Sequence, residues 1–327
     1  MNKLLTLNEV TDKINKGEIL ILAGDENLLN KLPKGKWIGG TIPYFVGDDG
    51  DVFTKDKIFT DNLPDYVENV KIKTYDESSL PQIALDEYKN GYSIIIIPGF
   101  SSIHTSFAEN SNQYKDIFLS PLIGWIAGID LADIGKVKPK VFNGFQDESS
   151  NEKAVAMHIE LPPDKIATLD IVNLFEQNEG DTITFSRTGF STTECFVNGE
   201  KKNFAEYLLE NKIDIKLPLV ANYYGAMINT SFSSIDEDKK VVNFYAPVFE
   251  HVEYKIAKPI ENYVSTFTKQ VSGLNISPVF SCNCILNYLY SELEGKKTAN
   301  IKGPMTFGEI AYQLLNQTMV YLNIEDA

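Results

Sequence analysis

Arginine is almost absent from this sequence of 327 residues. Arg187 is the only arginine, and lysine supplies the rest of the 30 lysine and arginine residues. Cysteine and histidine are scarce as well, with three of each. The cysteines, Cys195, Cys282 and Cys284, show neither a disulfide framework nor a zinc-binding spacing. We therefore expect a cytoplasmic protein, kept in a reducing compartment and without a metal site.

Several sequence features that would specify a membrane span, a cofactor or a known catalytic apparatus are also missing. No stretch approaches the roughly 20 uninterrupted apolar residues of a membrane helix, and the N-terminus lacks the apolar core of a signal peptide. The glycine-rich motifs for nucleotides, the H-E-x-x-H metalloprotease motif and a complete nucleophile elbow do not occur. A formal net charge of −15 opposes binding to nucleic acids and anionic membranes. We therefore expect that the protein has no cofactor and that it binds neither nucleic acids nor membranes.

The apolar residues that are present predict a layered fold. Residues 18–24 (EILILAG) and 93–100 (SIIIIPGF) are continuous apolar runs, typical of strands covered on both faces. Thr6 and Glu9 fit a capping box, and residues 78–91 predict a helix that ends at a glycine. This alternation predicts the α/β class (mixed α+β), and the chain length favours two domains, each with a mixed β-sheet flanked by helices. The polar segment 143–153 is one candidate linker between them.

The single arginine lies in a stretch that alternates like a strand. In residues 181–190 (DTITFSRTGF), Ile183, Phe185 and Arg187 share one face. A guanidinium on an apolar face needs a partner. It can reach the edge of the sheet, pair with a carboxylate of the protein, or hold a ligand carboxylate through two hydrogen bonds. The sequence leaves these alternatives open.

Two of the cysteines lie where a buried strand meets a helix. At such a position, backbone N–H groups and the helix dipole can lower a thiol pKa, which would make Cys282 or Cys284 a nucleophile. The more common role of a buried cysteine is that of a small apolar side chain.

The three histidines are far apart in the sequence. Ser101, Ser102 and His104 follow the apolar strand 93–100, and ligands often bind at the carboxyl ends of such strands. Alternatively, Ser101 or Ser102 simply caps the next helix. His158 alternates with apolar residues, and we expect it at an exposed or rim position.

The last fifty residues suggest a family. Residues 279–289 (VFSCNCILNYL) and 303–318 (GPMTFGEIAYQLLNQT) resemble the C-terminal domain of the FIST sensory family. The matching positions are Phe280, Ser281, Cys282, Gly303, Thr306, Phe307, Gly308, Glu309, Asn316 and Thr318. Residues 37–50 are similar to the companion N-terminal domain, with Gly39, Gly40 and Thr41 as the match. The resemblance implies two domains, 1–188 and 189–327.

The resemblance also implies a function. A FIST-type protein would be an intracellular, ligand-binding sensor of amino acids or related carboxylates that acts through a separate protein partner. In this chain Glu309 would accept an ammonium group, Arg187 would hold a carboxylate, and Gly308 would let the backbone approach the ligand. Glu309 could equally cap a following helix. The implied ligand-binding residues are Arg187, Gly308, Glu309, Thr306, Ser281, Cys282 and Thr41. The alternative function is a hydrolase or acyltransferase that uses Cys282, and we favour binding over catalysis.

Overall fold

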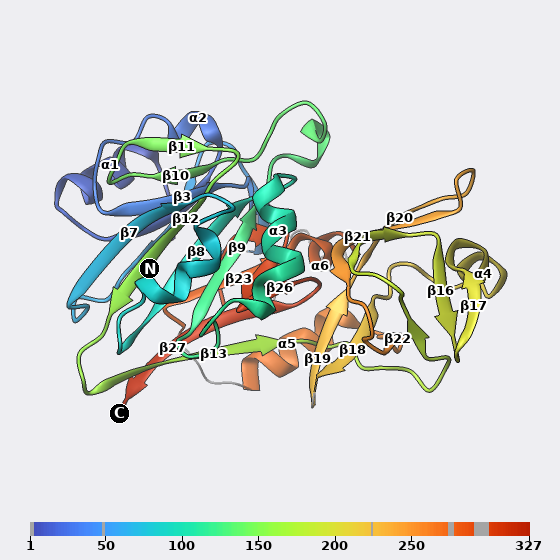
Figure 1. The fold of residues 1–327 in the computed structure, drawn as a ribbon. Coiled ribbons are helices and arrows are strands. Elements are labelled where there is room, and N and C mark those ends of the chain that lie inside the picture. Colours follow the sequence, from blue (N-terminus) through green and yellow to red (C-terminus); the bar gives the residue numbers. More distant parts are fainter. Residues whose placement is uncertain (1–2, 48–49, 224, 274–277, 291–300) are drawn as a thin grey trace.

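The computed structural model describes residues 3–47, 50–223, 225–273, 278–290 and 301–327. Its strands form several mixed sheets that are accompanied by few helices (Figure 1). This arrangement confirms the mixed α/β class predicted from the sequence.

The first sheet contains the N-terminal strands. Its order is β1 (Leu4–Leu5), β6 (Ile58–Asn62), β2 (Leu20–Gly24), β3 (Trp37–Thr41), β10 (Val141–Asn143) and β11 (Glu148–Ser150). Helix α1 (Leu7–Asn15) begins with the predicted capping box, because the Thr6 side chain accepts from Glu9 N and the Glu9 side chain accepts from Thr6 N. Helix α2 (Glu26–Leu29) follows β2. The predicted linker 143–153 is wrong, because β10 and β11 pair there as a hairpin within this sheet.

The central sheet has the order β26 (Gln313–Leu315), β25 (Glu309–Ala311), β9 (Leu122–Ala127), β8 (Gly91–Pro98), β12 (Ala154–Glu160) and β7 (Asn69–Tyr75). Ile94 and Ile96 of β8 join the core shared with the first sheet. Ile95 and Ile97 pack on the opposite face in the core that includes helix α3 (Ser102–Asn110). The strand is therefore buried on both faces, as its unbroken apolar run predicts.

Two local predictions around the central sheet need correction. The segment 78–91 forms a short 3-10 helix, η1 (Leu80–Asp86), and the backbone is already extended at Glu87. His158 is fully buried rather than at a rim. Strands β8 and β7 flank β12, and the face of β12 that carries His158 also carries Ala154 and Ala156, which belong to a hydrophobic core. Its ring nitrogens lie 2.7 Å from the hydroxyls of Tyr75 and Ser93, which satisfy both of them.

A third, four-stranded sheet packs against the same core and is built largely from the end of the chain. Its order is β13 (Lys165–Val172), β27 (Met319–Asp326), β23 (Phe280–Cys284) and β24 (Met305–Thr306). Strand β23 leads directly into α6 (Ile285–Tyr290), as the sequence predicts, while α5 (Tyr263–Gly273) precedes it. The hairpin β4 (Tyr44–Gly47) and β5 (Gly50–Phe53) and the 3-10 turns η2 (Ser111–Gln113) and η3 (Leu131–Asp133) complete this part.

The middle of the chain forms a separate lobe, drawn in yellow tones at one side of Figure 1. One sheet has the order β17 (Glu200–Asn203), β16 (Glu194–Val197), β14 (Ile183–Thr184), β22 (Tyr254–Ile256), β18 (Leu219–Tyr223) and β19 (Ala226–Thr230). The other has the order β15 (Gly189–Thr192), β21 (Val241–Val248) and β20 (Phe232–Asp236). Phenylalanines 185, 204, 232 and 244 fill the core between these sheets and α4 (Phe204–Glu210).

After the lobe, the end of the chain pairs again with strands that precede the lobe. Strand β25 pairs with β9, and β27 pairs with β13 along eight residue pairs. Residues beyond 188 thus contribute strands to sheets begun by residues before 188. The division at residue 188 into two domains stays a prediction.

Candidate functional site

Arg187 does not lie on a buried strand face. Strand β14 ends at Thr184, and the chain bends at residues 186 and 187 before β15 begins. Phe185 remains buried, but the bend turns Arg187 out to solvent. The expectation that this guanidinium shares the apolar face is therefore wrong, and the reason is the early end of the strand.

Glu309 is fully buried in β25 and is enclosed by polar neighbours. Its carboxyl oxygens lie 2.8 Å from the hydroxyl of Thr318 and 3.4 Å from the hydroxyl of Thr306. Burial raises the pKa of Glu309 from 4.5 to about 8, although hydrogen bonds from Thr318, Cys284 and Thr306 oppose this rise. The carboxyl group is therefore mainly protonated at neutral pH, and it caps no helix because β25 is a strand.

Ser281 and Cys282 of β23 belong to the same interior region. Ser281 donates to the carbonyl of Lys302 at 2.9 Å, and the Cys282 thiol donates to the carbonyl of Gly124 at 3.3 Å. Burial raises the pKa of the Cys282 thiol well above its usual value. Since the thiolate is the reactive form, this environment disfavours Cys282 as a nucleophile.

Gly308 serves packing at this point. Its carbonyl accepts a hydrogen bond from Ile126 N at 2.8 Å. A Cβ atom added here would lie 2.7 Å from a methyl carbon of Leu314. The sequence motif around Thr306, Gly308 and Glu309 thus builds a buried polar cluster next to β9.

Thr41 lies elsewhere, at the end of β3. Its hydroxyl accepts from Lys140 N at 2.9 Å, and it lines a polar hollow beside the carboxyl ends of β2 and β3. In that hollow Lys55 is 2.7 Å from Asp130 and 3.3 Å from Asp133, so its ammonium group is neutralised within the protein. The predicted ligand-binding residues are therefore distributed over a surface bend, a buried cluster and this separate hollow.

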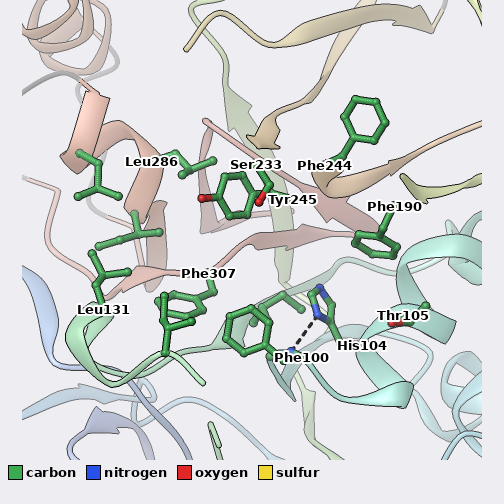
Figure 2. A pocket seen from close by; sticks show the side chains of 15 residues that line it. Phe100, His104, Thr105, Leu131, Phe190, Ser233, Phe244, Tyr245, Leu286 and Phe307 are labelled. Carbon is green, nitrogen blue, oxygen red and sulfur yellow. Dashed lines mark hydrogen bonds between the residues drawn. The ribbon is translucent and has the colours of Figure 1, made fainter. Parts of the chain in front are cut away.

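A different cavity, of about 230 Å³, opens beyond the carboxyl end of β8 (Figure 2). The sequence creates its floor where β8 ends at Pro98 and the chain turns through Gly99 and Phe100 into α3. Phe100 has φ 61°, an uncommon value for a large side chain, and 62% of its surface is exposed. Ser101 caps α3 by accepting from His104 N at 3.2 Å, as one of the two sequence interpretations predicts. This strained turn places the His104 ring at the cavity.

The second wall comes from an irregularity between the strands of the lobe. Gly189 pairs with Val248 but Ser191 pairs with Asn243, so β21 carries extra residues between these pairs. The pairing of β20 with β21 also shifts its register between Phe232 and Ser234, that is, at Ser233. Bulges of this kind redirect side chains. Four residues at these shifts line the cavity, namely Phe190, Ser233, Phe244 and Tyr245.

The third wall consists of α6 and the residue before Gly308. Leu286 and Leu289 of α6 and Phe307 line the cavity. The ring of Phe307 meets that of Phe100 edge to face, with 5.6 Å between their centroids. Figure 2 shows these aromatic side chains around a common space. No aspartate, glutamate, lysine or arginine occurs among the described residues that line it.

His104 is the buried polar group of the cavity. Its Nδ1 accepts a hydrogen bond from Phe100 N at 3.4 Å, drawn as a dashed line in Figure 2. Its Nε2 is buried and has no hydrogen-bond partner among the residues that the structure describes. Burial lowers the pKa of His104 to about 4, so the ring is neutral at pH 7. An unsatisfied polar group in a protein interior is costly and calls for an explanation.

Sequence reasoning found one part of this cavity, the segment Ser101–His104 after an apolar strand. It missed the aromatic residues 190, 244, 245 and 307 as cavity residues, because each looks like an ordinary core side chain in its own segment. Only the position of His104 after a strand end gave a usable signal.

Two general features of the described part of the chain bear on the remaining expectations. None of its helices combines the length and apolar character needed to cross a membrane. Within those same residues, His, Cys, Asp and Glu side chains do not gather in groups of three or more that could hold a metal ion.

Comparison with known proteins corrects the family resemblance. No match is found among curated proteins. The family model that matches covers residues 5–325 and describes a family of unknown function, DUF6976. The resemblance to FIST proteins, which rested on short motifs around Cys282 and Glu309, is therefore wrong, because the matching model is that of a different family. The chain belongs, over nearly its whole length, to the family of unknown function DUF6976.

Proposed function

We propose that this protein binds a small, uncharged and largely apolar molecule in the aromatic cavity beside His104. The observation that carries the proposal is the buried Nε2 of His104, which finds no hydrogen-bond partner in the described parts of the chain and belongs to the wall of a cavity of about 230 Å³. Binding sites typically combine an apolar lining with a few polar groups that fix orientation. This cavity has that composition.

The size of the cavity limits the ligand. An apolar cavity of about 150 Å³ accommodates benzene, so about 230 Å³ suits a molecule of one or two rings. Exposed Phe100 and Leu289 at its border give access from solvent.

The charge of the lining decides between ligand classes. An amino acid or another carboxylate would lose hydration on entry and find no cation among the described lining residues. We therefore propose an uncharged ligand in place of the amino acids expected from the sequence. A separate partner protein stays a prediction. A cytoplasmic location is proposed as well, and the three free cysteines support it.

Ligand-observed NMR tests this proposal with indole, 1-indanone, indane and phenylalanine as probes. We expect saturation transfer to the three uncharged compounds and none to phenylalanine. The variant Ser233→Trp places a large ring in the cavity and should abolish the transfer. Ser234→Trp is the matched control, because Ser234 is the next residue of the same strand, is exposed, and does not line the cavity.

Two results would contradict the proposal. One is the absence of binding by all three uncharged probes. The other is binding that survives Ser233→Trp unchanged, which would place the ligand elsewhere on the protein.

A further inference from the structure

The hydrogen bond to Nδ1 fixes the tautomer of His104. A backbone N–H can only donate, so Nδ1, which receives the bond from Phe100 N at 3.4 Å, must be the unprotonated nitrogen. A neutral imidazole carries one proton, and that proton is therefore on Nε2. The unpartnered atom of His104 is thus a donor.

The surroundings of Nε2 leave this donor without an acceptor. Thr105, the next polar residue of the wall, directs its hydroxyl to the carbonyl of Ser101 at 3.5 Å. The ring of Phe190 lies at 71° to the imidazole with 5.9 Å between centroids. An aromatic ring is only a weak acceptor for an N–H group. The described residues therefore do not satisfy this donor.

Phe190 is also the side chain that a ligand has to move. Nε2 is covered, and Phe190 packs against the imidazole from the irregular end of the β15–β21 pairing. Its side chain is only partly buried. A turn of this ring would bring Nε2 into the cavity.

On these grounds we infer that the cavity selects uncharged ring compounds that carry a hydrogen-bond acceptor, such as a carbonyl oxygen, and that His104 Nε2–H donates to it. This inference rests on the proposed function and specifies its ligand. The aromatic walls bind the ring, and His104 discriminates a ketone from a hydrocarbon of the same shape.

The test compares 1-indanone with indane, two bicyclic molecules that differ by a carbonyl group. We measure the ratio of their Kd values for the wild-type protein and for His104→Phe, which keeps a flat ring and removes the donor. Taking the quotient of the two ratios cancels the different hydrophobicity of the probes. We expect the Kd of indane divided by that of 1-indanone to be about 10-fold larger in the wild type than in His104→Phe. His251→Phe is the control, because His251 is exposed and does not line the cavity.

A second measurement needs no variant. In the wild-type protein, ¹⁵N NMR of His104 should show protonated Nε2 and unprotonated Nδ1 at pH 7. The Nε2 proton should shift downfield with 1-indanone and not with indane. Equal Kd ratios in wild type and His104→Phe, or a proton on Nδ1, would overturn the inference and leave the proposed function standing if both probes bind. Failure of 1-indanone and indane to bind would overturn the inference, and failure of indole as well would overturn the proposed function with it.

Discussion

Glu309 offers the sharpest test of the interior, through the substitution Glu309→Gln. The side chain is fully buried, and its carboxyl oxygens contact the hydroxyls of Thr306 and Thr318. Glutamine has the same shape and keeps an oxygen that can accept one of these hydrogen bonds. The substitution therefore removes the ionisation and leaves the packing nearly unchanged.

The magnitude follows from the pKa of Glu309, which burial raises from 4.5 to about 8. Between these two pH values Glu309 is protonated in the native state and ionised in the unfolded chain. Stability from this group is therefore complete below about pH 4.5 and is lost as the pH rises to about 8. A tenfold change in proton affinity is worth about 1.4 kcal/mol, so the total loss is on the order of 5 kcal/mol. Glu309→Gln should escape this loss and exceed the wild type in stability at pH 8.

The assay is urea unfolding of the wild type and the variant at several pH values from 5 to 9. Other buried carboxyl groups, such as Asp51 with a pKa raised to about 7 by burial, act in both proteins and cancel in the difference. The free energy of unfolding of the variant minus that of the wild type should rise with pH and level off near pH 8. Glu325→Gln, at an exposed position of β27, is the control for the chemical change itself. A difference between Glu309→Gln and wild type that does not vary with pH would refute the reasoning.

Three further predictions concern the fold. Thr6→Ala removes the capping box of α1 and should lower the free energy of unfolding by about 1 kcal/mol in urea titrations; an unchanged midpoint would mean that the cap contributes nothing. Gly124→Ala would place a Cβ 1.8 Å from the carbonyl oxygen of Ile95, so we expect a loss of about 3 kcal/mol or more, against little change for Gly189→Ala, where the nearest of the surrounding atoms is 4.0 Å away. All three cysteines are buried and free, so iodoacetamide at pH 8 should label none in the native protein and three in urea, as counted by mass spectrometry. Rapid labelling of Cys282 in the native protein would revive the nucleophile hypothesis.

The sequence could predict features that depend on neighbours along the chain. The capping box at Thr6, the cap at Ser101 and the double-sided burial of β8 each follow from spacing within about ten residues. The predicted helix at 78–91 became a short 3-10 helix, because local spacing does not fix how far a helix extends before tertiary packing draws the chain into a strand. The expectation that Arg187 shares the apolar face of a strand was wrong for a similar reason, since the alternating pattern continued past the residue where β14 ends.

The tertiary structure alone decided the candidate site. Residues 99, 100, 104, 190, 233, 244, 245, 286, 289 and 307 meet at one cavity. Their meeting depends on strand pairings between distant segments and on the shifted register of β21. Likewise, only the tertiary structure shows that Glu309 is buried in a polar cluster, where burial raises its pKa to about 8. The sequence by itself determined the layered fold class and local elements such as these caps and strands, because periodicity and capping are local. Which side chains face a shared space is settled by contacts between segments far apart in the chain, and a single sequence does not display those contacts.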